Sequence, residues 1–296
     1  MQERAWFRSA WLPYALLAPQ IAVTLVFFIW PASQALWQSF FLQDAFGFES
    51  RFVWFDNFAT LFADPLYLAS IRTTVVFSTL VTSIGLLLAL GLAAAADALG
   101  RSFLFYRLML VLPYAVAPAI AAVLWLIMFN PSIGVLAWAL QYVGVDWNHL
   151  LRADHAMILV VAAAVWKQVS YNFLFFLAGM QAIPQSLLEA AAIDGAGPVR
   201  IFTTIMLPMC KPVLTAITVF TFMGTWNDFN GPLIYLYDAN KYTLSLGLSF
   251  FKGLYTSQWN LLMAATVLVM LPILVIFFLA QDYIIDGISL SSGTKG

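Results

Sequence analysis

The sequence predicts an all-α protein that crosses a membrane several times. Hydrophobic residues make up 63% of the chain and charged residues only 9%, and the mean hydropathy is +0.90. These values lie far outside the range of soluble domains. Several stretches also reach the roughly 20 apolar residues that a spanning helix needs. The net charge of −1 gives no electrostatic basis for nucleic acid binding.

Six stretches qualify as spans, which places both termini on the same side of the membrane. Their orientation follows from the rule that Lys and Arg gather on the cytoplasmic side. One side carries Arg4, Arg8, Arg101, Arg107, Arg200, Lys211 and Lys295, and the other carries Arg51, Arg72, Arg152, Lys241 and Lys252. This bias predicts that both termini are cytoplasmic. The expected spans are 14–37, 70–96, 104–129, 156–181, 211–236 and 260–284.

Small and aromatic residues give finer expectations for the spans and their ends. The second span carries Gly85, Gly91 and alanines at 93–96. Small residues let helices approach closely in lipid, although alanine is also simply a good helix former. An interfacial helix is expected near 56–62. Aromatic side chains near span ends are expected to be membrane anchors: Trp11, Tyr14, Trp37, Trp125, Trp138, Trp147 and Trp259.

A polar stretch over 183–212 interrupts the apolar pattern between the fourth and fifth spans. Ser186 and Glu189 have the spacing of a capping box, which predicts a helix start there and a short helix over 187–193. Gly195 suits the left-handed residue after a helix. Pro198 suits the first position of a second helix. The stretch is therefore predicted to be a helix, a tight turn and a second helix at one membrane face.

The first polar group inside a span surrounds Lys167 in the fourth span. It includes Gln168, Tyr171 and Asn172. A Lys within a span is energetically costly, so its ammonium group should face a cavity, a partner or a carbonyl. Two interpretations remain open here, a polar lining on a solute path and an interhelical hydrogen-bond cluster.

The second polar group runs from Thr225 to Asn230 in the fifth span and includes Trp226, Asn227 and Asp228. Gly231 and Pro232 follow it. Gly-Pro predicts a break in the helix. Broken helices in membrane proteins expose backbone groups that line cavities. This group therefore favours a path lining over packing. An ion pair between Lys167 and Asp228 is one arrangement that the sequence allows.

The motifs of common enzymes are absent from the sequence. It contains no GxxxxGK[ST], GxSxG or HExxH pattern. His149 and His155 lie in one loop without clustered carboxylate or thiol groups, which argues against a metal site. We therefore expect no catalytic residue, metal or cofactor in this chain.

The polar stretch resembles the EAA motif of ABC importer permeases. Together with the six spans, it identifies the chain as similar to the binding-protein-dependent sugar permease family. The resemblance implies a type I ABC importer permease, with one transmembrane domain over 1–296 and a cytoplasmic coupling loop over 183–212. The motif match also includes Pro208. The resemblance assigns the coupling to an ATPase to Glu189, Ala190, Ala191, Asp194, Gly195 and Ala196.

The same resemblance implies the partners and the cellular location. Two cytoplasmic ATPase subunits would bind ATP and Mg, so that this chain holds no cofactor itself. A second permease subunit, or another copy of this chain, would complete the pathway in the bacterial cytoplasmic membrane. An extracytoplasmic solute-binding protein would dock on the loops 38–69, 130–155 and 237–259.

Shorter stretches resemble two different permease subunit types. Residues 7–14, 113–119 and 166–176 resemble the first permease subunit of bacterial sn-glycerol-3-phosphate importers, whereas 224–229 and 241–246 resemble the second type. The implied cargo is sn-glycerol-3-phosphate or its diesters. A neutral sugar or oligosaccharide is the alternative. An ion-coupled secondary transporter that uses Lys167 and Asp228 is the rival class.

Overall fold

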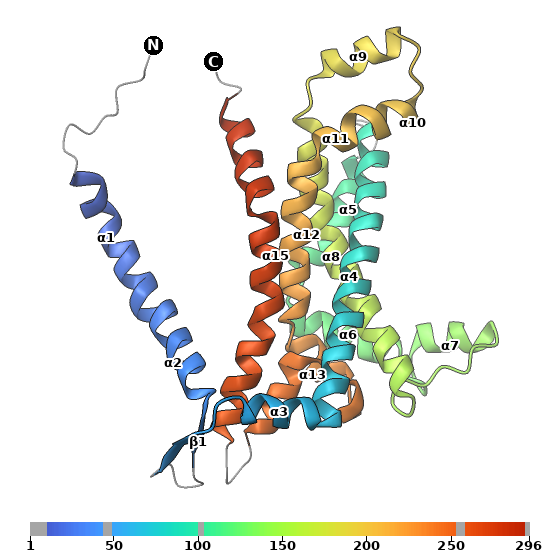
Figure 1. Ribbon diagram of the computed structural model, residues 1–296. Coiled ribbons are helices and arrows are strands. Elements are labelled where there is room, and N and C mark those ends of the chain that lie inside the picture. The colour runs from blue at the N-terminus through green and yellow to red at the C-terminus, as the bar shows by residue number, and fades with distance from the viewer. Residues whose placement is uncertain (1–10, 44–48, 100–103, 253–257, 294–296) are drawn as a thin grey trace. The chain divides into compact units, whose positions relative to one another are not determined.

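The computed structural model describes residues 11–43, 49–99, 104–252 and 258–293. Within these residues, four helices are long and apolar enough to cross a membrane, and two bent helix pairs raise the number to six if each pair is one span (Figure 1). The all-α class with six spans is therefore confirmed. The four continuous spans are Leu12–Gln38, Pro65–Ala98, Ala153–Gln181 and Trp259–Asp282.

The chain divides into two compact units. The first unit holds residues 1–64 and 250–270, and the second holds 65–249 and 271–296. The described elements of the first unit are α1 (Leu12–Thr24), a π-helical turn (Leu25–Ile29), α2 (Trp30–Gln38), the antiparallel strands β1 (Phe41–Gln43) and β2 (Ser50–Phe52), α3 (Asp56–Ala63), and the start of α15 (Trp259–Gly293). The helix expected near 56–62 is thus present as α3.

One asparagine joins three elements of the first unit. The Asn57 side-chain amide donates to the carbonyls of Ser39, at 2.7 Å, and Phe41, at 3.0 Å. The Asn57 side-chain oxygen accepts a hydrogen bond of 2.7 Å from Asn260 at the start of α15. These bonds satisfy a buried amide and hold α3 against the end of α2, β1 and α15.

The second unit is built on three long helices and their shorter neighbours. Helix α4 packs along α8 and α12, and α5 packs on α8. The elements are α4 (Pro65–Ala98), α5 (Leu104–Ala115), α6 (Pro118–Met128), α7 (Val135–Tyr142), α8 (Ala153–Gln181), α9 (Gln185–Ile193), α10 (Pro198–Ile201), a π-helical turn (Phe202–Met206), α11 (Leu207–Met209), α12 (Lys211–Trp226), α13 (Asn230–Tyr235), α14 (Leu244–Gly247) and the 3-10 helices Ala239–Lys241 and Leu248–Phe251.

The small face expected on the second span is largely confirmed. Ala89, Ala93 and Ala96 are fully buried within a cluster formed mainly by α4, α8 and α12. A Cβ added at Gly85 would lie 3.7 Å from Gln168 of α8, which shows a close approach of the two helices. Gly91 is different, because nothing lies within 4 Å of an added Cβ there. Close helix packing explains the alanines but not Gly91.

The third predicted span is not one continuous helix. Helices α5 and α6 meet at an angle of 102°. Pro118 is the first residue of α6, and Ala117 before it has φ −58° and ψ 135°. The residue before a proline avoids the helical region, so the helix has to break here. The expected span over 104–129 is therefore present as a bent pair of helices and not as one continuous helix.

The fifth predicted span is also broken. Helix α12 ends at Trp226, residues 227–229 are not helical, and α13 follows. The predicted break is confirmed, but it lies before Gly231 and Pro232, which are inside α13. At its other end, α12 meets the preceding helical segment Pro198–Met209 at 69°.

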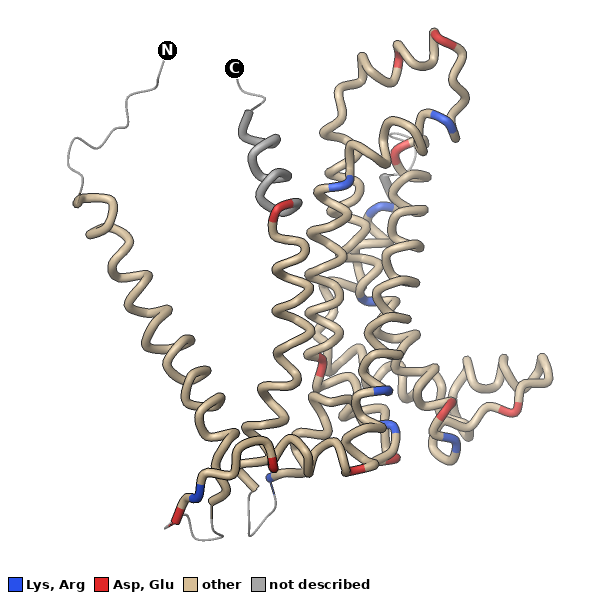
Figure 2. The backbone as a smooth tube through the Cα atoms, viewed as in Figure 1, with Lys and Arg blue, Asp and Glu red and all other residues tan. Residues whose placement is uncertain are grey.

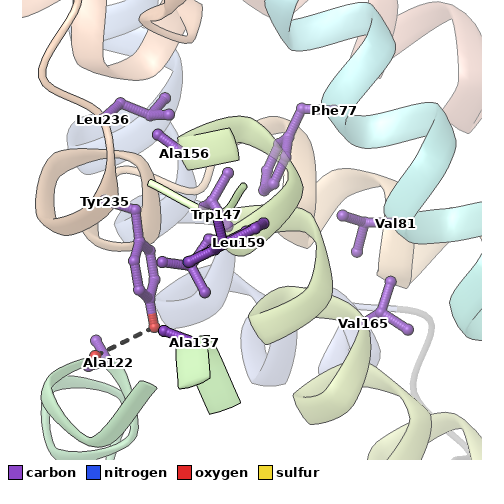
Figure 3. Packing of buried hydrophobic residues seen from close by; sticks show 11 residues of the cluster. Phe77, Val81, Ala122, Ala137, Trp147, Ala156, Leu159, Val165, Tyr235 and Leu236 are labelled. Atoms are coloured by element: carbon purple, nitrogen blue, oxygen red, sulfur yellow. Dashed lines mark hydrogen bonds between the residues drawn. The ribbon is translucent and has the colours of Figure 1, made fainter. Parts of the chain in front are cut away.

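A hydrophobic cluster holds α13 and the loop before α8 against the unit (Figure 3). The Tyr235 hydroxyl donates to the Ala122 carbonyl at 3.3 Å, and Phe77, Val81 and Trp147 lie in the same cluster. Trp147 is buried, and its indole N–H donates to the Phe129 carbonyl at 3.0 Å. The expectation of an anchor at Trp147 was therefore wrong, because the loop folds back onto the core.

Candidate functional site: a polar cavity and an exposed loop

A cavity of about 410 Å³ lies among α5, α6, α8, α12 and α13 of the second unit. Figure 2 shows that most charged residues lie toward the helix ends, whereas this cavity has one cation and one carboxylate on its wall. Its lining combines aromatic with polar side chains, as small-molecule sites commonly do. The polar lining residues are Lys167, Gln168, Tyr171, Thr221, Thr225, Asp228 and Asn230.

Lys167 of α8 is the cationic group of this cavity. Lys167 is half-buried, and Gln168 and Tyr171 of the same helix lie beside it on the cavity wall. In the described part of the chain, the Lys167 ammonium group makes no hydrogen bond and no ion pair. A half-buried cation without a partner is costly, so it is available to an anionic ligand.

Asp228 lines the same cavity, but its carboxylate is hydrogen-bonded to the backbone of α13. Its carboxylate accepts a hydrogen bond of 3.1 Å from the Gly231 N–H and another from the backbone of Asn230. These N–H groups at a helix start have no partner within the helix. An added Cβ at Gly231 would lie 2.6 Å from the carboxylate, so the arrangement requires glycine. Lys167 and Asp228 therefore share a cavity without forming an ion pair.

The sequence-predicted path residues divide into two groups. Lys167, Gln168, Tyr171 and Asp228 line the cavity, whereas the other three do not. Asn172 is fully buried and accepts a hydrogen bond of 2.9 Å from the Thr221 hydroxyl.

The other two residues outside the lining lie at the end of α12. Trp226 is buried. The Asn227 side chain donates to the Met223 carbonyl at 2.9 Å, and its own carbonyl accepts from Ser245 at 3.1 Å. Some of these polar residues thus line a cavity, whereas others form hydrogen bonds within the helix bundle.

Several lining residues were missed by the sequence analysis. Thr221 was not singled out, although it lies four residues before Thr225 and seven before Asp228, and this helical spacing was a usable signal. Tyr114 and Trp125 come from either side of the α5–α6 bend, which the sequence analysis did not predict. Trp125 lies near Trp166, with ring centroids 5.8 Å apart and planes tilted by 57°. Its expected anchoring role was therefore wrong, because the bend turns it toward the cavity.

The loop over 183–212 has the predicted order of elements. Helix α9 is followed by Gly195 with φ +82°, and Pro198 is the first residue of α10. The Ala196 N–H donates to the Ala191 carbonyl at 2.9 Å and closes the turn. The left-handed glycine and the proline start are both confirmed.

The predicted capping box at Ser186 is wrong. Helix α9 begins at Gln185, with Pro184 before it in an extended conformation and no side-chain cap. Ser186 is therefore already inside the first turn, where its hydroxyl group is too late to cap the helix start. The proline fixes the backbone direction in place of a capping side chain.

The motif residues of this loop are presented on an open surface. No residue of α9 is buried, and Glu189, Ala190, Asp194 and Gly195 are exposed. Ile193 is 85% exposed. Leu188 is the half-buried residue that packs against the α4–α8–α12 cluster. An exposed acidic and apolar surface of this kind suits a protein partner.

Two broken spans around a polar cavity, together with an exposed helical loop, fit the membrane component of a transport system. Comparison with known families agrees. The family described as "Binding-protein-dependent transport system inner membrane component" matches residues 82–289, and the chain belongs to this family. It is a type I ABC importer permease, a transport subunit and not an enzyme.

Relatives extend this finding. The chain is 54% identical over 228 residues to the sn-glycerol-3-phosphate transport system permease protein UgpA of Shigella flexneri. The aligned region covers 76% of this chain and 77% of the relative. The UgpA protein of Escherichia coli O157:H7 gives the same identity and coverage. That of Yersinia enterocolitica is 52% identical over 76% and 77% of the two chains.

Solved structures support the fold. A bacterial ABC transporter involved in the import of the acidic polysaccharide alginate matches with a TM-score of 0.77 and 24% identity, over 92% of this chain and 94% of that chain. The MetNI methionine ABC transporter matches with a TM-score of 0.54 and 16% identity, over 77% and 96%. At these identities the likeness concerns the fold alone.

Proposed function

We propose that this chain forms the translocation path for sn-glycerol-3-phosphate or its diesters in an ATP-driven importer. The observation that carries the proposal is the unpartnered Lys167 ammonium group in the cavity of a chain that is 54% identical to sn-glycerol-3-phosphate permeases. A phosphate group attracts a cation strongly in a site with little water. Asp228 does not neutralise Lys167 at contact distance, because its carboxylate bonds the start of α13.

The remaining lining suits the glycerol part of such a cargo. Gln168, Tyr171, Thr221 and Thr225 carry groups that can exchange hydrogen bonds with hydroxyls. Gln168 and Tyr171 can both donate and accept. The Thr221 hydroxyl already donates to Asn172 and the Thr225 hydroxyl to backbone carbonyls of α12, so these two can accept hydrogen bonds from the solute. A path needs contacts that are favourable but weak enough to release the solute.

The energy for transport would enter through the 183–212 loop. Helix α9 would dock on an ATPase chain through Glu189, Ala190, Ala191, Asp194 and its exposed neighbours, while Gly195 and Ala196 hold the turn behind it. ATP and Mg would be bound by two cytoplasmic ATPase subunits. A helix that few contacts hold to its own chain suits this role, because its position then depends on the partner.

The other partners and the orientation follow from the same role. A second permease subunit, or another copy of this chain, would complete the path, and 1–296 would act as one permease domain. An extracytoplasmic binding protein would deliver the solute to the loops 38–69, 130–155 and 237–259. Both termini would be cytoplasmic; of the cations behind that orientation, Arg4, Arg8, Arg101 and Lys295 lie outside the described residues.

The test measures solute uptake by the assembled importer in proteoliposomes. It separates the effect of the Lys167 charge from that of the hydrogen bonds that Asp228 makes at the start of α13. Lys167→Met should lower ATP-dependent uptake of labelled sn-glycerol-3-phosphate by about tenfold or more, and Lys167→Arg should retain most of it. Asp228→Asn keeps a hydrogen-bond acceptor for α13, so it should retain more uptake than Asp228→Ala. Unchanged uptake by Lys167→Met would contradict the proposal.

A neutral sugar is a second candidate cargo, favoured by the aromatic lining. Tyr114 and Tyr171 have ring centroids 5.9 Å apart, and Trp125 lies near Trp166. Aromatic faces pack well against sugar rings. In the same assay, ATP-dependent uptake of a neutral sugar that is unchanged by Lys167→Met would identify this alternative. Uptake that needs an ion gradient and no ATPase would instead identify a secondary transporter.

A further inference from the structure

The loop between α6 and α8 carries an apolar surface that no described element covers. Residues 130–145 contain no Asp, Glu, Lys or Arg. Helix α7 lies within this stretch, and Trp138 and Tyr142 are 64% and 81% exposed. Their rings are stacked, with centroids 5.7 Å apart. Exposed apolar side chains of the same surface are Ile133, Val135 and Val143.

The start of α7 is fixed by a turn that only glycine permits. The Gly134 N–H donates to the Asn130 carbonyl at 2.8 Å. A Cβ added at Gly134 would lie 2.4 Å from the Met128 carbonyl oxygen and 2.6 Å from the Asn130 nitrogen. Behind the turn, Ala137 is fully buried in the cluster around Trp147. Because Ala137 packs inward, the opposite face of α7, with Trp138 and Tyr142, points away from the protein core.

The segment after α7 is equally well anchored. Trp147 donates to the Phe129 carbonyl and stacks on His155, with ring centroids 5.0 Å apart and planes 13° apart. The Asn148 N–H donates to the His155 ring nitrogen Nδ1 at 3.1 Å. These contacts join the loop to the first turn of α8. Ala137 of α7 lies in the same buried cluster as Ala156 and Leu159 of α8, so a movement of α7 relative to α8 would have to open this cluster.

The position of α7 in the chain places it at a membrane face. It follows the span that ends with α6 and precedes the span α8, which begins at Ala153. Figure 1 shows α7 running sideways from this end of α8. The first charged residue after α7 is Asp146, which pairs with Arg152. The apolar face and the charged segment are thus separated along the loop.

We propose that α7 lies in the lipid interface of the membrane face opposite the 183–212 loop. Trp and Tyr are favoured at this depth because their rings combine apolar bodies with polar tips. Lipid is the occupant that the chemistry selects. The exposed face offers no charge to specify a protein partner, so a binding protein on the loop 130–155 would meet the charged residues after α7 and not this face. The helices α6 and α8 that flank α7 in the chain belong to membrane spans.

The consequence concerns α8. Because α7 and Trp147 are fixed to the start of α8, an interfacial α7 sets the depth of that helix in the bilayer. Lys167 and Gln168 lie on α8, so their depth would be fixed as well. The α7 surface would thus hold the cavity wall in place while other parts of the importer move.

The test measures the depth of single spin labels in the assembled importer in phosphatidylethanolamine–phosphatidylglycerol nanodiscs. In a Cys210→Ala background, labels at Trp138→Cys and Tyr142→Cys are compared with a water control, Asp146→Cys, and a lipid control, Leu87→Cys. Leu87 is 71% exposed within the span α4. Power saturation then reports contact with oxygen, which favours lipid, and with a water-soluble nickel complex.

The expected result is a ratio of oxygen to nickel accessibility at 138 and 142 at least about threefold above that at 146. A ratio equal to that at 146 would overturn the proposal, because the face would then be in water. Low accessibility to both reagents would also overturn it, because a protein partner would then cover the face. A label at Val143→Cys gives a second reading if a substitution within α7 prevents assembly.

Discussion

Helices α7 and α9 are attached near the two ends of α8 and differ in how they are held. Helix α7 buries Ala137 fully, and the loop after it is tied down by Trp147. Helix α9 has no buried residue, and half-buried Leu188 is its packing contact with the core of the unit. Both expose large apolar side chains, so exposure alone does not distinguish their roles.

The difference teaches how one long helix can serve two purposes. A helix that its own chain fixes at one end keeps its depth and rotation. At the other end of the same helix, a weakly held element such as α9 can be displaced by a partner. Elements that move, such as α9, are expected to have low local stability, whereas elements with dense contacts are expected to have high local stability. Three predictions test this contrast.

The largest effect is expected from Gly134→Ala. The added Cβ would meet three backbone atoms of residues 128 and 130 at 2.4–2.7 Å, so the turn before α7 must shift. We expect a loss of about 3 kcal/mol, which lowers the melting temperature of the purified protein by about 5 °C or more.

The matched control for this prediction is Gly91→Ala. An added Cβ there has nothing within 4 Å, and the residue is helical, so stability should be unchanged or slightly higher. Equal melting temperatures for the two variants would show that the start of α7 is not firmly held.

A smaller effect on stability, but a clear one on coupling, is expected from Gly195→Val. Its φ of +82° costs a β-branched residue about 1–2 kcal/mol, although there is open space around it. Because α9 is weakly held, the strain should displace the helix and not unfold the protein. Substrate-stimulated ATP hydrolysis in the assembled importer should fall about tenfold.

Gly197→Val is the control for the loop. It also has open space, but its φ of −71° is ordinary. It should retain coupling and stability. If both variants lost coupling to the same degree, the left-handed turn would not be the cause.

The smallest effect concerns pH at the fixed end. Burial lowers the pKa of His149 below its ordinary value of 6.5, and a backbone hydrogen bond with Phe129 partly opposes this. The unfolded chain then takes up a proton more readily than the folded one, so stability is full above pH 6.5 and falls as the pH drops below it.

This prediction is checked by melting temperatures of the purified protein between pH 7.5 and 5.5. His149→Gln cannot titrate, so its melting temperature should fall less over this range than that of the parent. Identical slopes for the two proteins would rule out a contribution from His149.

Features set by local chemistry could be predicted from the sequence. The spans follow from composition, and Gly195 and Pro198 mark the turn of the 183–212 loop because their backbone preferences are intrinsic. Lys167 and Asp228 were both candidates for lining a solute path, and an ion pair between them was one arrangement that the sequence allowed. The hydrogen bond from the Gly231 N–H to the Asp228 carboxylate joins residues only three apart, but Gly231-Pro232 by itself predicts only a helix break.

Features set by packing could not be predicted. Trp125 and Trp147 carry the same side chain near span ends, and their composition signals an interfacial ring in both cases. The bend at Pro118 turns one toward the cavity, and a hydrogen bond to Phe129 buries the other. Whether a Trp faces lipid, solute or core depends on its neighbours in space, which are distant in sequence.

The hydrogen bond between Asn57 and Asn260 has a consequence for biogenesis. Its partners are 203 residues apart, and the first unit contains both early and late parts of the chain. A ribosome makes proteins from the N-terminus at about 5–20 residues per second, so Asn57 leaves it many seconds before Asn260. Until then the buried Asn57 amide lacks its late partner, and the early segment remains exposed to chaperones and proteases.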